Sequence, residues 1–241
     1  MPVRYSKQLA MKDKTPALVA FAKDPERTAV KTRLSDSFDK KQRHCIYAAL
    51  LRDTLSTLTE LEHSASIYLA CFPDSNSPFF KKLADEFGVE LTDQRGEDLG
   101  ERLAFCLEQL LKRHRPVIIF GTDTPLLPLA EIRAAIESCQ YDLILGSAMD
   151  GGYYAVGLSG RKPVFCHELF RGVKWSTASV MEDTLKNARA LALETQTLPP
   201  ARDIDTGSDI DSILANLDNL DEEKKSRMKS FLQSPGILQR G

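Results

Sequence analysis

With 241 residues, of which 42% are hydrophobic, the chain is long enough for one sizeable α/β domain with a full core. Its 32 Lys and Arg nearly balance its 34 Asp and Glu, and a formal net charge of −2 excludes a global field that would attract nucleic acid or an anionic membrane. Any phosphate binding must therefore be local. The five cysteines are widely spaced and lack a C-x-x-C pair, which argues against a disulfide framework or a zinc ribbon and indicates a reduced, cytoplasmic protein.

The two ends of the chain differ from its middle in composition. The first 14 residues are polar and basic, and no run anywhere approaches the roughly 18 apolar residues that a membrane span needs. We expect residues 1–14 to be a flexible leader and residues 15–219 to form a single domain. Residues 220–241 are expected to be a charged C-terminal tail, either helical or disordered.

The first part of the chain alternates apolar runs with helical patterns. An apolar run over residues 17–23, followed by Asp24-Pro25, predicts a strand that leads into a loop. Residues 40–62 have the apolar spacing of a helix, and residues 66–72 predict a second strand. A short helix over residues 79–87 should stop at Gly88. A polar loop from Gln94 then leads into a helix with an apolar face over residues 99–111.

The middle of the chain continues this alternation and then breaks it. Residues 116–120 predict a buried strand, residues 129–139 a helix and residues 141–146 a further strand. The pattern predicts a three-layer α/β/α fold with a mostly parallel sheet. The run at 153–158 follows too closely for a crossover helix, so we expect an antiparallel excursion there. Ser176 or Thr177 would then cap a helix to residue 191, followed by a weaker strand at 193–198 and a closing helix at 209–217.

Asp123 stands directly after the central buried strand, in the segment Gly121-Thr122-Asp123-Thr124-Pro125. In open α/β sheets the ligand crevice lies beyond the carboxyl ends of the strands, so this carboxylate is expected to face a pocket. Gly121 would allow close backbone approach there. The alternative is that Asp123 is a turn residue or the cap of the next helix.

Charged residues of both signs are candidates to join Asp123. Lys23, Lys31 and Arg33 follow the first strand, where Arg33 could bind phosphate bidentately and Lys31 as a point charge; a solvated basic turn is the alternative. Asp123 together with Asp203 or Asp205 could bind a hard divalent cation. Because Asp203 and Asp205 alternate along an extended segment, we expect only one of them to face the site.

Two glycine-containing stretches offer backbone groups to a ligand. The loop from Gln94 to Gly100 places N–H groups at a helix N-terminus, although Glu97 and Asp98 could occupy that position as caps. The segment Asp150-Gly151-Gly152 lets the backbone turn sharply or approach a ligand, and a plain β-turn is its alternative. Trp175 is interpreted as a core residue.

Seven short motifs occur in order along residues 17–210. They are Phe21-Ala22-Lys23-x-Pro25, Val30-Lys31-Thr32-Arg33-Leu34, Gln94-x-Gly96-x-Asp98-Leu99-Gly100-Glu101-Arg102, Gly121-x-Asp123-x-Pro125, Asp150-Gly151-Gly152-Tyr153-Tyr154, Trp175-Ser176-Thr177 and Asp203-x-Asp205-Thr206. Together they resemble the DUF2064 family, which is similar to the GT-A, nucleotide-diphospho-sugar transferase fold. Relatives of that fold include glycosyltransferases and nucleotidyltransferases such as the molybdenum-cofactor and phospholactate guanylyltransferases.

The resemblance implies a nucleoside di- or triphosphate on the C-terminal edge of the sheet, with Mg²⁺ (or Mn²⁺) held by Asp123 and Asp205. It implies Lys31, Arg33 and Asp123 as catalytic residues. The implied nucleotide-binding residues are Ala22, Lys23, Lys31, Arg33, Gln94, Gly96, Asp98, Gly121, Asp150, Gly151 and Gly152. The family has Pro-Gly before its Val-Lys-Thr-Arg, whereas this chain has Arg27-Thr28, and a positive φ at Thr28 would suit a β-branched residue poorly.

Three functions are compatible with these residues. The first is nucleotidyl transfer from a nucleoside triphosphate to a small phosphorylated acceptor, in which a divalent metal, Lys31 and Arg33 would stabilise phosphate charge. The second is glycosyl transfer from a nucleotide-sugar. A single Asp in place of an Asp-x-Asp pair, and the cationic loop, favour the first. The third is nucleotide binding without catalysis, which the threonine at position 28 makes plausible. None of the three involves nucleic acid or a membrane span.

Overall fold

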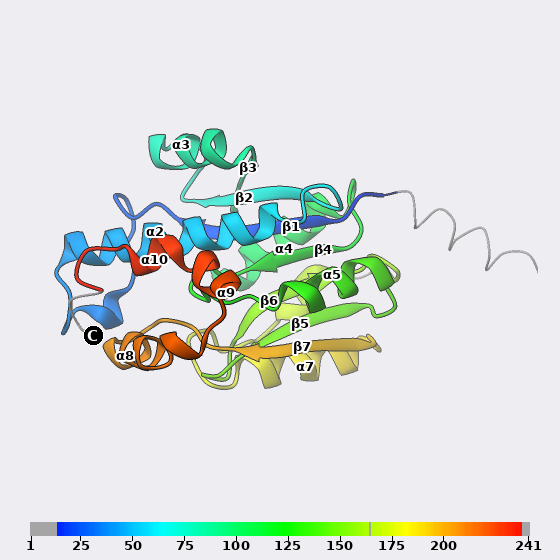
Figure 1. The fold of residues 1–241 in the computed structure, drawn as a ribbon. Coiled ribbons are helices and arrows are strands. Elements are labelled where there is room, and N and C mark those ends of the chain that lie inside the picture. The colour runs from blue at the N-terminus through cyan, green and yellow to red at the C-terminus, as the bar shows by residue number, and fades with distance from the viewer. Residues whose placement is uncertain (1–13, 164, 238–241) are drawn as a thin grey trace, which may run out of the picture.

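The computed structural model describes residues 14–163 and 165–237, and these build a seven-stranded sheet between layers of helices (Figure 1). The strand order is β3-β2-β1-β4-β6-β5-β7. The expected leader falls almost entirely on residues 1–13, which lie outside the described ranges. The strands are β1 (Ala17–Lys23), β2 (Ser66–Phe72), β3 (Glu90–Asp93), β4 (Val117–Phe120), β5 (Leu143–Ala148), β6 (Tyr153–Leu158) and β7 (Thr195–Ala201).

The sheet is mostly parallel, and its exception is the predicted one. β1 pairs in parallel with β2 and β4, while β6 runs antiparallel between β4 and β5. The antiparallel excursion is thus confirmed. β3 was not predicted, because its four residues carry too few apolar side chains for a recognisable pattern. β7 includes Pro199 and Pro200, which is compatible with its place at the edge of the sheet, where a missing N–H breaks no ladder.

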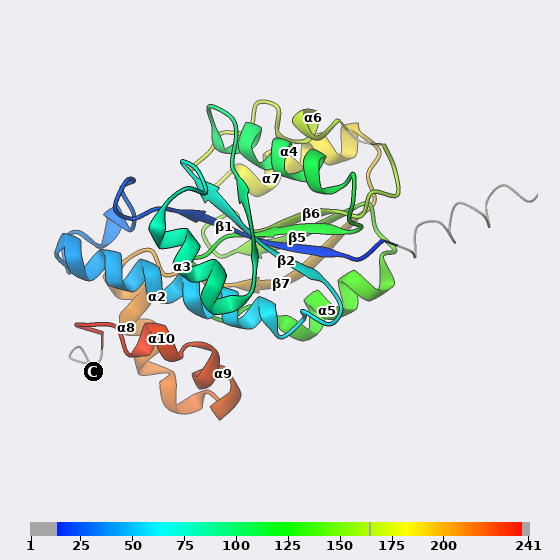
Figure 2. The same ribbon diagram turned by 90° about the horizontal axis from the view of Figure 1, so that it is seen from above.

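Helices cover both faces of the sheet, as the β-α alternation predicts (Figure 2). On one face, α2 (Lys40–Thr59), α3 (Pro78–Phe87) and α5 (Leu129–Ser138) pack on strand residues such as Leu18 and Ala20. On the other face, α4 (Leu99–Leu110), α6 (Cys166–Phe170) and α7 (Val180–Ala190) pack on Ala17 and Val19. Successive residues of β1 therefore serve opposite cores, since side chains alternate along a strand.

The C-terminal segment forms a further layer outside α2 (Figure 2). It consists of α8 (Gly207–Ala215), η2 (Leu217–Asn219), α9 (Glu222–Arg227) and α10 (Lys229–Leu232). Met228, Phe231 and Ile237 are fully buried in a third cluster, against Ile46 and Leu50 of α2. The Asp53 carboxylate of α2 accepts hydrogen bonds from the backbone N–H groups of Ser230 and Phe231. Residues 220–237 thus pack against the domain despite their charged composition.

Two helix boundaries follow from backbone conformation. α7 begins at Val180 with Ser179 at its N-cap, so the expectation that Ser176 or Thr177 caps it is wrong. Ser176 has a φ of 63°, which no regular helix accommodates. α3 ends at Gly88 with a φ of 66°, as predicted. Across the described ranges, no helix combines the length and apolarity needed to cross a membrane.

Candidate functional site

Two adjoining chambers lie beyond the carboxyl ends of β1 and β4. The inner chamber has a volume of about 510 Å³ and the outer chamber about 490 Å³. Both volumes fall in the range of small-molecule sites. The wall residues common to the two are Lys23, Lys31, Thr32, Leu99, Asp123, Tyr153, Trp175 and Ser176. The chambers lie at the strand ends, as the sequence predicts. β2, β1 and β4 are parallel, so their carboxyl ends meet at one edge of the sheet.

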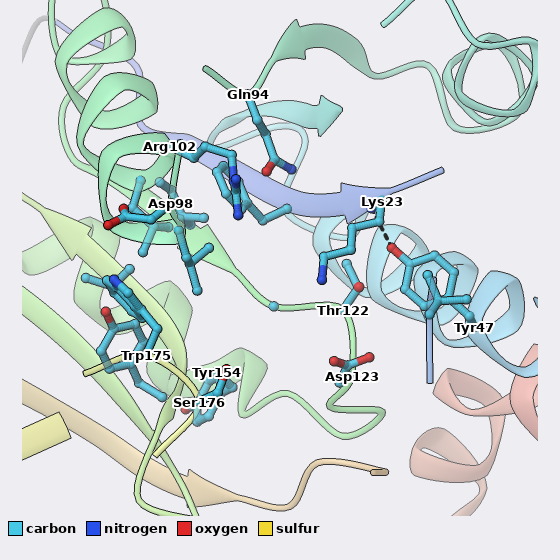
Figure 3. A pocket seen from close by; sticks show the side chains of 18 of the residues that line it. Lys23, Tyr47, Gln94, Asp98, Arg102, Thr122, Asp123, Tyr154, Trp175 and Ser176 are labelled. Carbon is cyan, nitrogen blue, oxygen red and sulfur yellow. Dashed lines mark hydrogen bonds between the residues drawn. The ribbon is translucent and has the colours of Figure 1, made fainter. Parts of the chain in front are cut away.

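The inner chamber has a mixed apolar and polar wall, to which Gln94 contributes an immobilised amide (Figure 3). Gln94 is 6% exposed, and its Nε2 donates to the carbonyl oxygens of Ala22 and Ala70, each at 2.9 Å. The amide nitrogen therefore donates to carbonyl oxygens at the ends of β1 and β2, and Oε1 is the free acceptor of Gln94. Ala22 contributes this carbonyl, but its buried side chain is not a wall of either chamber.

Arg102 of α4 is a wall residue that the sequence analysis placed in a motif but not in the site. Its guanidinium lies 4.7 Å above the ring of Phe72, and its Nε is buried without a hydrogen bond. Burial lowers the pKa of Arg102, although Asp98 opposes this effect. Figure 3 shows the Arg102 and Lys23 side chains extending toward the same space above Asp123. Two positive side chains thus face the interior of the inner chamber.

Asp98 and Gly96 have different positions. Asp98 lines the inner chamber and also caps α4, because its carboxylate accepts from the Glu101 N–H at 2.8 Å. Gly96 lines neither chamber. It has a φ of 137°, and a Cβ there would lie 2.5 Å from the Cβ of Glu101, so this glycine is required by the tight loop before α4.

Three carboxylates meet at the rim of the outer chamber. The Ile204 N–H donates to the Asp123 carbonyl oxygen at 2.9 Å, and the Thr124 hydroxyl donates to the Asp203 carboxylate. The segment after β7 therefore runs alongside the segment after β4. Asp203 and Asp205 both line the chamber, so the expectation that only one of them would face it is wrong. Residues two apart in an extended segment share a face, and Ile204 between them turns into the third core cluster.

Lys31 lies among these acids. Its Nζ is 2.5 Å from Asp123 Oδ1, 3.6 Å from Asp205 Oδ1 and 2.5 Å from the Ile204 carbonyl oxygen, and its side chain is only 2% exposed. Lys31 has a left-handed backbone with a φ of 48°, a conformation that costs a non-glycine residue about 1–3 kcal/mol. Arg33, 58% exposed, donates to Asp205 Oδ2 at 3.1 Å. The structure thus brings together four of the predicted charged residues.

The charge density at the rim affects the pKa of Asp203. Burial, helped by the neighbouring Asp123 and Asp205 and opposed by Thr124 and Lys31, raises the pKa of the Asp203 carboxyl to about 6. Nearby, the Tyr47 hydroxyl accepts from the Lys23 N–H at 2.6 Å, and burial raises the pKa of Tyr47. Tyr47 of α2 is a second wall residue, and the helical spacing of residues 40–62 does not predict its place in the site.

The acids fit a hard divalent cation. Asp123 Oδ1 is buried and accepts no hydrogen bond, and it contacts a positive charge instead. Mg²⁺ is often bound by one or two carboxylates, with substrate phosphate and water completing the shell. Within residues 14–163 and 165–237, no three His, Cys, Asp or Glu side chains are arranged as a metal-binding group, so a cation at the rim would take at most two carboxylates from the protein. The predicted pair Asp123 and Asp205 is therefore chemically suited to such an ion.

The Asp150-Gly151-Gly152 turn forms the opposite wall of the outer chamber. Asp150 and Gly152 line it, and the Asp150 carboxylate accepts from the Gly152 N–H at 3.0 Å. Gly151 does not line it. A Cβ on Gly151, which has a φ of 88°, would lie 2.3 Å from the Ala178 carbonyl oxygen, so Gly151 holds the turn against the loop before α7. Gly121 lines the inner chamber, and a Cβ added to it would lie 3.8 Å from the nearest atom, the Tyr154 carbonyl oxygen.

Trp175 and Ser176 belong to that loop and separate the two chambers. Trp175 packs against Phe170 and Tyr153, in agreement with a core role, but it also lines both cavities. The strained backbone of Ser176 was not detectable from the sequence, since nothing in its neighbours demands a left-handed conformation. Their shared motif, Trp175-Ser176-Thr177, was the signal that could have placed both residues in the site.

The basic loop after β1 is compatible with a side chain at position 28. Thr28 is not among the described residues with positive φ, and its N–H donates to the Asp24 carbonyl oxygen at 2.8 Å. The residue of this loop with a left-handed backbone is Lys31. Lys23, by contrast, is exposed, lines both chambers and has no ammonium partner within the described part of the chain. Its charge is therefore available to a ligand.

Comparisons with known proteins identify the family and the fold of the chain. The profile of a family described as "Uncharacterized protein conserved in bacteria (DUF2064)" matches residues 54–177. No curated protein matches the chain. Among solved structures, a provisionally assigned nucleotide-diphospho-sugar transferase from Desulfovibrio desulfuricans G20 has a TM-score of 0.79 and 26% identity, over 93% of this chain and 97% of the other.

Two further solved structures share the fold at lower identity. The 4-diphosphocytidyl-2C-methyl-D-erythritol synthase from Anaerococcus prevotii has a TM-score of 0.58 and 11% identity, over 87% of this chain and 99% of the other. The glucosyl-3-phosphoglycerate synthase from Mycobacterium tuberculosis, solved with Mn²⁺, UDP and glucosyl-3-phosphoglycerate, has a TM-score of 0.50 and 11% identity, over 96% and 83%. The fold is therefore the GT-A-like fold that nucleotidyl- and glycosyltransferases share.

Proposed function

The chain belongs to the DUF2064 family, and from its GT-A-like site we propose that it is a divalent-metal-dependent nucleotidyltransferase. It transfers a nucleotidyl group from a nucleoside triphosphate to a small phosphorylated acceptor. The observation that carries this proposal is the meeting of Asp123, Asp203 and Asp205 with Lys31 and Arg33, at the mouth of a chamber of about 510 Å³ with a mixed apolar and polar wall.

Each part of the site has a role in this reaction. The inner chamber excludes water from the nucleoside, and Gln94 Oε1 accepts from it. Lys23 and Arg33 direct positive charge at the phosphates, where charge spreads over the oxygens during transfer. A bound Mg²⁺ or Mn²⁺ at Asp123 and Asp205 supplies further neutralisation of phosphate charge. No covalent nucleophile on the protein is needed, because the acceptor attacks the α-phosphate directly.

Glycosyl transfer from a nucleotide-sugar is the second candidate. It is supported by the solved relative that contains Mn²⁺ and UDP, and by the acidic and hydroxyl groups of Asp150 and Ser176 on the outer wall. The single Asp123 after β4 and the free ammonium of Lys23, which suits a triphosphate, favour nucleotidyl transfer. Nucleotide binding without catalysis loses its specific support, because Thr28 does not adopt a positive φ.

The first test is turnover with defined donors. Incubation with each nucleoside triphosphate, Mg²⁺ and a panel of phosphorylated acceptors should release pyrophosphate. Release of free nucleoside diphosphate from UDP- or GDP-sugars would identify the protein as a glycosyltransferase instead. Tight binding with neither product would leave only the non-catalytic function.

The second test concerns the acids. Asp123→Ala and Asp205→Ala should each abolish Mg²⁺-dependent nucleotide binding, measured as the loss of the thermal shift that nucleotide and Mg²⁺ produce together. Asp85→Ala is the matched control, because Asp85 is exposed on α3 and lines neither chamber. Unchanged binding in both site variants would remove the metal-site proposal.

A further inference from the structure

Lys31 occupies the position at which a metal would contact Asp123 and Asp205. Its ammonium lies 2.5 Å from Asp123 Oδ1 and from the Ile204 carbonyl oxygen, and a longer ion pair of 3.6 Å joins it to Asp205 Oδ1. We propose that Lys31 is the resident counter-ion of the metal site and that it leaves these acids for phosphate when a metal–phosphate pair arrives. This inference rests on the proposed function, since it assumes that the site binds a metal and a phosphorylated nucleotide.

The burial of Lys31 is the first argument. An ammonium has three donors, and three oxygens lie around this one, on Asp123, Asp205 and Ile204. Lys31 lines both chambers, but only 2% of its side chain is exposed, so most of its surface is already covered by protein. Lys23 differs in both respects, because it is exposed and unpaired within the described ranges. In this state Lys23, and not Lys31, is the ready phosphate ligand of the loop.

The contact with Asp123 is the second argument. Asp123 Oδ1 is buried and accepts no directed hydrogen bond, yet it lies 2.5 Å from the ammonium nitrogen. The contact is a close ion pair, so a metal cation would offer this oxygen the same kind of charge partner. Mg²⁺ binds oxygen at 2.0–2.1 Å, so it cannot share this oxygen with the ammonium without strong repulsion. Metal binding therefore requires exchange.

The exchange of the Lys31 ammonium for a metal ion couples metal binding to phosphate binding. A metal ion alone would cost Lys31 its contacts with Asp123 and the Ile204 carbonyl oxygen. It would leave Asp203, which already accepts from the Thr124 hydroxyl, as the remaining buried carboxylate of the chamber, so metal binding is weak. A phosphate that enters with the metal gives the released ammonium a new partner. The left-handed backbone of Lys31 lies in the loop between β1 and α2, so the move requires a change in this loop alone. Metal and nucleotide should then each strengthen the binding of the other by the same factor.

Lys31→Met separates this role from simple phosphate binding. Mn²⁺ titrated into the protein without nucleotide should bind on the order of tenfold more tightly to Lys31→Met than to the parent, because no ammonium competes for the acids. The mutual strengthening of Mn²⁺ and nucleoside triphosphate should fall to near onefold. Lys82→Met is the matched control, since Lys82 is exposed on α3 and lines neither chamber, and its Mn²⁺ affinity should equal that of the parent.

One outcome of the Mn²⁺ titration would contradict the proposal. Mn²⁺ affinity that is unchanged or lower in Lys31→Met would overturn the exchange, because Lys31 would then be a fixed structural ion or only a phosphate ligand. Lys31→Gln is the second variant, to be used if Met in this acidic surrounding prevents folding; the same affinities are expected of it. The Mn²⁺ titration without nucleotide does not depend on turnover, so failure of nucleotidyl transfer and failure of the exchange give different results.

Discussion

Asp203 is held in a state that favours its protonated form. Its carboxyl has a pKa raised to about 6 by burial and by the neighbouring Asp123 and Asp205, against an ordinary value near 4 in the unfolded chain. A raised pKa of an acid means that the folded state binds the proton more tightly. The contribution of Asp203 to stability therefore falls as the pH rises from about 4 to about 6, and the loss persists above that range.

Asp203→Asn should consequently stabilise the protein at pH 7. The amide keeps an oxygen for the Thr124 hydroxyl but carries no charge, and we expect a gain of about 1 kcal/mol after allowance for solvent screening, or a rise in Tm of about 2–4 °C. At pH 4 the gain should vanish, because the parent carboxyl is then protonated as well. Calorimetry at the two pH values measures this, and an equal gain at both would contradict the electrostatic cause.

The chemical roles of individual residues were predicted better from the sequence than the contacts that these residues make. The position of Asp123 after a buried strand and its pocket-facing place follow from local pattern alone, and the structure agrees. The contact between Lys31 and Asp123 could not be predicted, because it depends on a loop conformation with positive φ at a non-glycine residue. Arg102 was recognised as part of a motif, yet its entry into the chamber depends on how α4 packs.

The turn between β5 and β6 shows how packing between elements sets the need for glycine. At Gly151, a φ of 88° and the Ala178 carbonyl oxygen both oppose a side chain, so Gly151→Ala should cost about 2–4 kcal/mol. Gly121→Ala should stay within about 0.5 kcal/mol, because its backbone is ordinary and the nearest atom is 3.8 Å away. Urea unfolding of the pair measures both, and similar losses would contradict this distinction.

The elements themselves were largely predictable, since β1, β2 and β6 match the runs at 17–23, 66–72 and 153–158. Apolar runs bounded by turn residues are a strong local signal. The start of α7 was misjudged because hydroxyl residues at 176, 177 and 179 are all chemically able to cap a helix, and tertiary packing of the loop on Gly151 selects the last of them.

The arrangement of the chain as a whole brings the acids together. β7 pairs with β5 at the edge of the sheet, and the chain then returns past the end of β4, where Ile204 bonds to Asp123. Sequence alone indicates that both segments are polar strand ends, but not that the second one crosses the sheet to meet the first. The buried side chain of Ile204 anchors this crossing in the cluster that α2 forms with the C-terminal helices.

The C-terminal helices should therefore support both the fold and the site. Phe231 is fully buried in the same cluster as Ile204, so Phe231→Ala should lower the free energy of unfolding by about 3–5 kcal/mol. Phe165→Ala is the matched control, since Phe165 is 82% exposed and its loss should cost at most about 0.5 kcal/mol.

Because Asp203 and Asp205 flank Ile204, Phe231→Ala should also weaken Mn²⁺ binding while the variant is still folded at low temperature. Urea unfolding and Mn²⁺ titration at 10 °C measure the two effects. A destabilised Phe231→Ala protein with parental Mn²⁺ affinity would show that the acids are positioned by the sheet alone.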